Sequence, residues 1–422
     1  MEMEFPTEII NQLELEKDTN SRDRVFSTTN TLLTMVLTAT QVDKSMKNSV
    51  TLYHTIHQQR KEQMLQTLRE KVKREKERDV KGGKKAGRPK HYQIQLSESL
   101  KKDISLNTAA YSKARDRVPL SITHELFKAT RLQNAENAYT SWHGHRVFLG
   151  DGTYLQMQDT EDIRKQYDIK NKGESTQGYP QGLLEVLIER GTGQVYTYRL
   201  ANRHTSELPL LYDMIDEIPQ GSVLLLDDLY NCFEIFSKCK RRGIEIVVPA
   251  KREKQFELIE HITDGDDIIL KRTPKNRSKW LEKNEDPGTI MLRRIECKSP
   301  DGSDYLLYTT ILERTIKKDE FQLLYLTRWD VEISIREVKT IMNINILRSK
   351  TPDMVLKELT VALSAYNLIR KVIYASIKDL PFSPIEDIIF KFYTHNQELH
   401  VDKKGRVYSR WSTGRKRAEP TD

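Results

Sequence analysis

The sequence predicts an α/β protein in which a helical region precedes a mixed sheet and a β-rich segment is inserted into the sheet domain. Residues from Gln41 to about Val80 are rich in Lys, Glu, Gln, Leu and Met and contain no Gly or Pro, which indicates helix. Residues 141–250 alternate short apolar runs with helical patterns, as in sheets covered by helices. Residues 251–320 place turn signals between short alternating runs, which indicates a β-rich insertion.

The elements of the core follow from these patterns in chain order. Strands are expected at Arg146–Leu149, Leu183–Glu189, Val195–Leu200, Ser222–Leu226 and Ile244–Ala250. Gly191-Thr192-Gly193 is expected to join the second and third strands as a hairpin turn. Helices are expected at Thr205–Ile215 and Cys232–Arg242 and, after the insertion, at Gln322–Ile344, Met354–Ile377 and a short segment past Pro384.

Positive charge is concentrated in two parts of the chain, whose formal net charge is +8. Residues 60–90 contain 13 Lys and Arg against 5 Asp and Glu, and residues 403–417 contain seven Lys and Arg and no acid. Clustered charge of this kind attracts a polyanion such as DNA. A solvated helix face followed by a charged tail is the alternative interpretation.

A short motif within the first basic segment has two interpretations. Gly87-Arg88-Pro89 is flanked by lysines and can lie in a narrow minor groove, as an AT-hook does, although Ala86 stands where a hook prefers arginine. A charged linker is the interpretation that we favour. In either case the candidate DNA-binding residues are Lys84, Lys85, Arg88 and Lys90.

These features divide the chain into five expected parts. Residues 1–140 form a mainly helical DNA-binding region with the basic segment 60–90, and residues 141–250 form the first part of the core. Residues 251–320 are the β-rich insertion, residues 321–400 carry the helices that complete the core, and residues 401–422 are a basic tail.

Several classes of protein are excluded by what the sequence lacks. The first residues are acidic, so we expect no secretory signal, and no stretch approaches the roughly 20 apolar residues of a membrane span. The three cysteines form no C-x-x-C pair, so we expect reduced cytoplasmic thiols and no zinc site. The sequence contains no G-x-x-x-x-G-K-[ST] loop, so we expect no use of ATP, and no H-E-x-x-H or G-x-S-x-G motif.

Two aspartates stand where a sheet usually presents functional groups. Asp151 and Asp227 each come just past an apolar run, and ligands of α/β sheets gather at strand ends. Either aspartate alone is more simply explained as a turn residue. His204 and Glu207 follow another strand and border the same region, although a hydrogen-bonded histidine and a helix-start glutamate explain them as well.

A third acid lies on the helix that follows the insertion. Seven residues return within about 20° of the starting direction on a helix, so Tyr325, Glu332 and Lys339 form one stripe. Arg328 and Arg336 lie one turn on either side of Glu332. The neighbours are largely apolar, so we expect a helix buried on most sides with this polar stripe lining a cleft. A solvent-facing helix with ion pairs is the alternative.

The polar stripe carries a specific resemblance. Tyr325, Arg328, Glu332 and Lys339 match Y-x-x-R-x-x-x-E-x-x-x-x-x-x-K without a gap, and in this the chain resembles a large group of bacterial insertion-sequence transposases of the DDE type. Asp151-Gly152-Thr153 matches the D-G-T around that family's first acid. Asp227 and Tyr230 match its second acid and the aromatic residue three positions later. The resemblance covers roughly residues 140 to 400.

The resemblance implies a fold, an activity and partners. It implies a ribonuclease H-like catalytic core with a β insertion, in which Asp151, Asp227 and Glu332 hold two Mg²⁺ or Mn²⁺ ions. It implies cleavage of double-stranded DNA at terminal inverted repeats, strand transfer into target DNA, and a homodimer on two DNA ends. The expected location is the bacterial cytoplasm, on the nucleoid when DNA is bound. Tyr325, Arg328, Arg336 and Lys339 are its expected DNA contacts.

A hairpin intermediate at the transposon end is also implied, and it requires a flipped base that an aromatic side chain can stack. Trp280, which follows a basic loop in the insertion, is the candidate, and a tryptophan of the core is the simpler explanation. Two other functions remain. One is a ribonuclease H-like nuclease that cuts without joining, and the other is a non-catalytic DNA-binding derivative.

Overall fold

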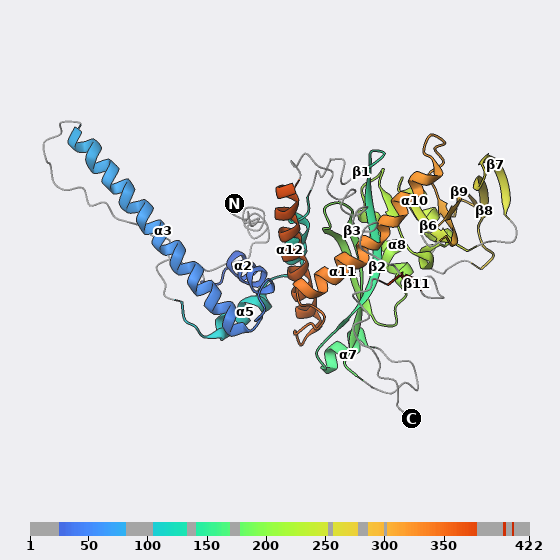
Figure 1. Cartoon of the computed structure of the whole chain (residues 1–422). Coiled ribbons are helices and arrows are strands. Elements are labelled where there is room, and N and C mark those ends of the chain that lie inside the picture. The colour runs from blue at the N-terminus through green and yellow to red at the C-terminus, as the bar shows by residue number, and fades with distance from the viewer. Residues whose placement is uncertain are drawn as a thin grey trace, which may run out of the picture.

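The computed structural model describes residues 25–81, 104–132, 141–168, 178–251, 256–276, 286–298, 302–377, 400–401 and 407–408 (Figure 1). The candidate DNA-binding residues Lys84, Lys85, Arg88 and Lys90 lie outside these ranges. So do the candidate Trp280, the helix expected past Pro384 and most of the basic tail. No helix among the described residues has both the length and the apolar character of a membrane span.

The core is a mixed sheet whose strands run in the order β4-β3-β2-β5-β6-β10-β9-β8-β7, with β1 paired to β2. Its first strands are β1 (Ser141–Trp142), β2 (His145–Gln156), β3 (Gln181–Glu189), β4 (Val195–Asn202), β5 (Val223–Leu225) and β6 (Glu245–Ala250). The strands β2, β3 and β4 are antiparallel, whereas β5 is parallel to both β2 and β6. This mixed α/β topology confirms the expected ribonuclease H-like fold class.

Helices cover both faces of this sheet because its central strands are apolar throughout. On β5, Val223 and Leu225 join one buried cluster and Leu224 joins the other, since successive side chains of a strand point to opposite faces. One cluster includes α8 (Glu207–Met214) and α9 (Phe233–Arg241). The other includes α6 (Leu120–Ala129), α10 (Lys318–Leu326), α11 (Asp330–Ile341) and α12 (Pro352–Ile377).

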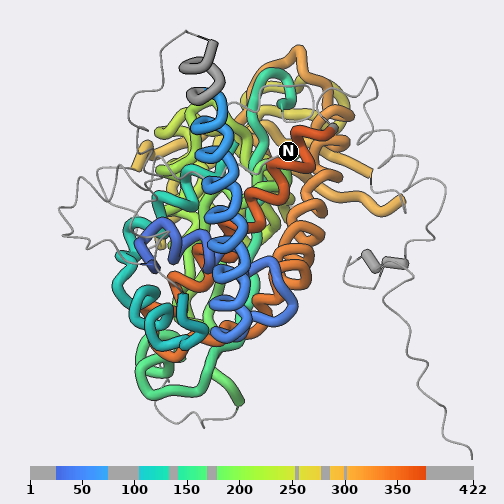
Figure 2. Tube along the Cα trace, turned by 90° about the vertical axis from the view of Figure 1, so that its left-hand side faces the viewer, coloured from blue at the N-terminus to red at the C-terminus, as the bar shows by residue number. Residues whose placement is uncertain are grey.

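The helical N-terminal region packs on α12. It comprises α2 (Thr28–Ala39), α3 (Met46–Lys81), α5 (Thr108–Arg117) and α6, and the long α3 projects away from the body of the molecule (Figure 1). From the side of these helices, α3 is seen to run across the front of the molecule (Figure 2). The expected helix therefore exists, but it begins at Met46. Before it, the Asp43 carboxylate accepts a hydrogen bond from the Ser45 amide, and the Asp43 carbonyl accepts one from the Asn48 side chain.

The β-rich insertion extends the same sheet instead of forming a sheet of its own. Its strands are β7 (Glu257–Thr263), β8 (Asp266–Arg272), β9 (Thr289–Lys298) and β10 (Asp304–Thr309), and β10 pairs antiparallel with β6. Arg293 on β9 is buried and forms an ion pair of 2.6 Å with Asp266 on β8. The same guanidinium donates to the carbonyls of Glu313 and Ile316, so it ties the insertion to the segment that leads into α10.

The prediction of one continuous helix from Gln322 to Ile344 is wrong. A 3₁₀ turn, η4 (Thr327–Trp329), separates α10 from α11. α11 ends at Ile341, and Asn343 adopts a left-handed φ of 44°. The expected burial on most sides is also wrong, because Leu326 is 41% exposed and Ile333 is 43% exposed. The helices α10 and α11 face the sheet with one side, and the apolar side chains of Leu326 and Ile333 on their other sides are exposed to solvent.

Candidate active site

Asp151 lies within β2. The sequence-based prediction that it lies past the end of a strand is therefore wrong. All of β3 pairs with the part of β2 from Phe148 to Gln156. This pairing continues β2 through Asp151. The Asp151 carboxylate accepts a hydrogen bond of 2.9 Å from the backbone of Gly152. Burial raises the pKa of Asp151 to about 6, and the carboxylates of Glu332 and Asp227 contribute to the rise.

Asp227 lies level with Asp151, two residues past the end of the adjacent parallel strand β5. Leu149 pairs with Leu225, and each aspartate comes two residues later on its own chain segment. Side chains two positions apart share a face, so both carboxylates lie on the face where Leu149 and Leu225 pack toward α11. Neighbouring strands are about 4.8 Å apart. The two aspartates are therefore presented side by side.

The chain turns immediately after Asp227. Asp227 keeps an extended backbone and its carboxylate accepts a hydrogen bond of 2.9 Å from the amide of Leu229, which begins the 3₁₀ turn η2 (Asp228–Tyr230). The Tyr325 hydroxyl donates to the carbonyl of Leu226 at 3.2 Å and so holds this turn against α10. Asp228 is exposed. It is the first residue of the 3₁₀ turn.

Glu332 faces the two aspartates from α11, and a cation lies among the three acids. Arg328 donates to the Glu332 carboxylate at 3.3 Å, with its side chain only 12% exposed. The positive charge of Arg328 also lowers the pKa values of Asp151 and Asp227 against the larger effect of their burial. Arg328 therefore neutralises part of a buried negative cluster.

The remaining residues of the stripe have different surroundings. Lys339 donates to the Thr153 hydroxyl at 3.0 Å and thereby ties α11 to β2 just beyond Asp151. Arg336 is exposed on α11. The 3₁₀ turn does not separate Tyr325, Glu332 and Lys339, because all three still point toward β2 and the Asp227 turn.

Two further carboxylates border the site behind Gly152. A Cβ atom at Gly152 would lie 2.3 Å from Glu207 Oε1 and 2.9 Å from Glu185 Oε2, so a larger residue there would displace these carboxylates. The sequence indicated Glu207 as a residue that borders the site, whereas His204 is exposed in the turn after β4. Glu185 was not predicted. An acid in the middle of the apolar run from Leu183 to Ile188 was the signal that could have identified it.

Glu185 connects the Asp227 turn to the centre of the sheet. It is fully buried and accepts a hydrogen bond of 2.7 Å from the Tyr230 hydroxyl, the aromatic residue that follows Asp227 by three positions. Burial raises the pKa of Glu185 to about 9, and the charges of Glu207, Asp151 and Asp227 add to this effect. At neutral pH Glu185 is therefore protonated, which makes its burial beside other acids possible.

We predict that Glu185→Gln reduces the pH dependence of stability. A carboxyl group with a folded pKa of about 9 and an unfolded value near 4.5 stabilises the protein fully below pH 4.5. That stabilisation declines as the pH rises and is lost above about 9. Melting temperatures in EDTA from pH 5 to pH 9 should therefore fall less steeply in Glu185→Gln than in the wild type. Parallel profiles would contradict this, and Glu161→Gln, at an exposed position, is the control.

Among the described residues, no three His, Cys, Asp or Glu side chains lie close enough together to hold a metal ion in the observed rotamers. The donor chemistry nevertheless suits a hard cation, since carboxylate oxygens are the ligands that Mg²⁺ prefers. Burial raises the pKa values of Asp151 and Asp227, and a cation bound between them would favour their charged forms. The Glu332 carboxylate is hydrogen-bonded to Arg328. If that bond broke, Glu332 could join Asp151 and Asp227 as a third carboxylate ligand.

Comparisons with known proteins identify the family of this region. The family model for the transposase DDE domain matches residues 142–368. The transposase InsG for insertion sequence element IS4, from Escherichia coli strain K12, is 24% identical over 269 residues, which are 62% of this chain and 60% of InsG. The putative transposase InsZ of the same strain is 27% identical over 160 residues, covering 37% of this chain and 54% of InsZ.

The chain thus spans little more than half the length of each of these relatives. Among solved structures, the cryo-EM structure of a piggyBac transposase synaptic complex with hairpin DNA aligns with 58% of this chain and 51% of that chain, at 12% identity and a TM-score of 0.33. The family model covers more than half of the sequence and includes Asp151, Asp227 and Glu332. The chain therefore belongs to the transposase DDE domain family.

Proposed function

We propose that this protein is a DNA transposase that cuts DNA at the ends of its own insertion sequence and joins those ends to target DNA. The observation that supports this most strongly is the level placement of Asp151 on β2 and Asp227 just past the adjacent parallel strand β5, faced by Glu332. All three lie inside the region matched to the transposase DDE domain. The InsG relative is named for an insertion sequence element, which supports the same substrate for this chain.

The carboxylates of Asp151, Asp227 and Glu332 would hold two Mg²⁺ or Mn²⁺ ions. Ions bound there would activate the attacking oxygen and stabilise the leaving oxygen of a phosphodiester. Asp151 and Asp227 are already kept in place by the backbone amides of Gly152 and Leu229. Glu332 would complete the set by leaving Arg328.

The basic side chains around the acids would bind the DNA backbone. Once Glu332 leaves it, the Arg328 guanidinium would be available to a phosphate, and its planar donors suit a bidentate contact. Lys339 would hold a neighbouring phosphate from the edge of β2, and Arg336 would reach the backbone from the exposed side of α11. Tyr325 would act mainly through its contact with the Asp227 turn.

The remaining parts of the proposal rest on the family resemblance and, for ATP, on the lack of a P-loop motif in the sequence. The protein would act as a homodimer on two double-stranded ends, without ATP, and would associate with the nucleoid in the cytoplasm. The cleaved end would pass through a hairpin intermediate. Trp280 would then stack the flipped base.

The test of this function uses a labelled duplex that carries the inverted repeat flanking the gene, together with Mg²⁺ and a supercoiled target plasmid. A transposase releases the end and then yields plasmid molecules covalently joined to the label. A nuclease of the same fold gives cleaved ends without joined products. A non-catalytic derivative binds the duplex and leaves it intact, so the three functions give three different results.

The basic segment should contribute affinity for DNA of any sequence. We expect the combined replacement of Lys84, Lys85, Arg88 and Lys90 by Ala to lower affinity, because fewer counterions are released on binding. The slope of log affinity against log salt should decrease by up to about four units, roughly one for each lost phosphate contact. Affinities measured between low and physiological salt provide the slope, and an unchanged slope would contradict the role.

A further inference from the structure

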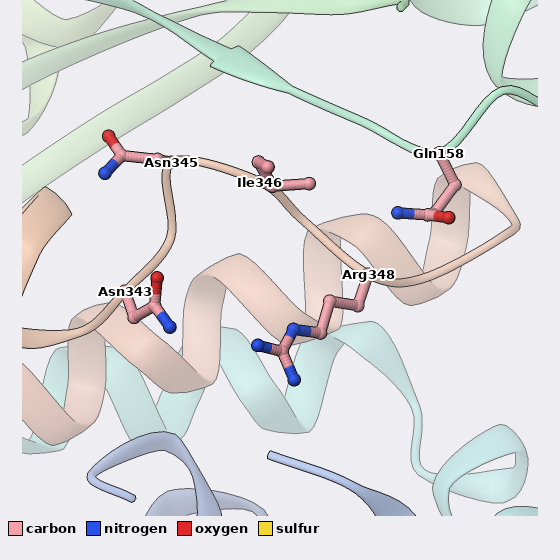
Figure 3. Close-up of a pocket in the computed structure, with 5 residues that line it drawn as sticks. All are labelled: Gln158, Asn343, Asn345, Ile346 and Arg348. Carbon is pink, nitrogen blue, oxygen red and sulfur yellow. The ribbon is translucent and has the colours of Figure 1, made fainter. Parts of the chain in front are cut away.

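A polar pocket lies at the far end of the two elements that carry the acids. It is open to solvent, has a volume of about 590 Å³ and is lined by Gln158, Asn343, Asn345, Ile346 and Arg348 (Figure 3). Gln158 follows β2, which carries Asp151, and the other four belong to the loop after α11, which carries Glu332. Figure 3 shows the Asn343 and Arg348 side chains extending toward one another from this loop.

The backbone of this loop is hydrogen-bonded to its neighbours, whereas its polar side chains are exposed. Ile344 and Leu347 are buried, whereas Asn343, Asn345, Ile346 and Arg348 are exposed. The loop pairs with the end of β2, since Gln156 donates to the Asn345 carbonyl at 2.9 Å and Leu347 donates to the Gln156 carbonyl at 2.8 Å. The backbone amide of Arg348 donates to the Glu358 carboxylate on α12 at 3.0 Å.

The pocket also adjoins the N-terminal helical region. The ammonium group of Lys44, just before α3, contacts the carbonyls of Met342 and Asn343. Burial lowers the pKa of Lys44, and the charge of Arg348 contributes to this effect. Two basic side chains from distant parts of the sequence therefore lie beside the pocket, and no carboxylate is among its lining residues.

The side chains of the pocket have no partner within the described part of the chain. No hydrogen bond or ion pair joins the side chains of Gln158, Asn343, Asn345 or Arg348 to another described residue. The rim thus offers three amides and one guanidinium. Asparagine and glutamine amides pair with the edges of bases, and arginine binds phosphate or guanine. These are the groups by which proteins recognise DNA.

The position of the pocket relates it to the acids. From Glu332 to Asn343 is 11 residues, which is about 16 Å along a helix. Successive phosphates of one DNA strand are about 3.4 Å apart along the duplex, so this length corresponds to about five base pairs. Lys339, tied to Thr153, lies between the two points. DNA held at the acids and aligned with α11 would therefore pass over Lys339 and reach the pocket.

We propose that this pocket binds the transposon end about five base pairs from the cleaved phosphate. The amides of Asn345 and Gln158 contact base edges, and Arg348 holds the backbone. The pocket then contributes to recognition of the element's own sequence, while the three acids act on any phosphodiester placed between them. This inference rests on the proposed transposase function and adds a specificity site to it.

The test compares two duplexes in the presence of Ca²⁺. One carries the flanking inverted repeat, and the other has base pairs four to six from the cleavage site replaced. We expect the wild type to prefer the first duplex by about tenfold, as one or two amide–base contacts can provide. The double variant Asn345→Ala with Gln158→Ala should lose this preference, whereas Arg348→Ala should weaken binding of both duplexes equally.

The control is Arg242→Ala, an exposed arginine after α9 on the opposite face of the sheet, which should behave as the wild type. All four substituted positions are at least partly exposed, so melting temperatures should stay within about 2 °C of the wild type. A wild type that cuts the end but shows no preference at these base pairs would overturn the pocket assignment. So would a double variant that keeps the preference. A wild type that neither binds nor cuts the end would instead overturn the proposed function.

Discussion

Asp227→Asn is expected to abolish both end cleavage and strand transfer, whereas Asp228→Asn is expected to retain substantial activity. The two residues are adjacent, yet only Asp227 lies level with Asp151 and on the face that α11 covers. An amide in place of its carboxylate holds a divalent cation poorly, because the cation prefers charged oxygen ligands. Asp228 is exposed at the start of the 3₁₀ turn, where a carboxylate can interact with nearby backbone amides, and its charge adds to the rise in the pKa of Asp227.

The measurement is cleavage of the labelled end duplex, first with Mg²⁺ and then with Mn²⁺. Asp151→Asn and Glu332→Gln should behave as Asp227→Asn does, and all three variants should still bind the duplex. An inactive Asp228→Asn beside an active Asp227→Asn would show that the metal-binding aspartate is the second of the pair. If any of the three acids is dispensable with both metals, the three-carboxylate mechanism fails for this chain.

Asp227 could be predicted from the sequence because the strand before it is apolar on both faces. Ser222–Leu226 has no alternation, which indicates a strand covered on both sides, and β5 is buried in this way. Asp227 follows as the first polar residue, and the chain turns there. Glu332 and Lys339 could be predicted as well. Both lie on α11, where residues seven positions apart lie on the same face of the helix.

Other features depend on contacts between distant residues and could not be predicted. Asp151 was expected past a strand end because Gly150 and Gly152 surround it, but pairing with β3 continues the strand through both glycines. The 3₁₀ turn at Thr327–Trp329 interrupts a sequence that has no Gly or Pro in this segment. The bond between Tyr230 and Glu185 joins residues 45 positions apart and explains why an aromatic residue follows Asp227.

Arg328→Ala and Lys339→Ala are each expected to slow end cleavage by roughly 10- to 100-fold while leaving the fold intact. The loss of a charge-assisted contact to a phosphate costs about 1.5–3 kcal/mol. Arg328 has 12% of its side chain exposed and lies among the three acids, so a phosphate there would be poorly screened by solvent. Lys339 contacts Thr153 on β2, so its loss also removes one tie between α11 and the sheet.

The Mg²⁺ dependence separates two roles that Arg328 can have. If Arg328 only neutralises the acids until cations bind, its removal is compensated by cations, and saturating Mg²⁺ restores the rate of Arg328→Ala. If it holds the phosphate during cleavage, the rate stays low at every Mg²⁺ concentration, which is the result we expect. Arg328→Lys, which keeps the charge but loses the planar pair of donors, should then be intermediate. Wild-type rates in both alanine variants would show that the Arg328 and Lys339 side chains take no part in binding the substrate.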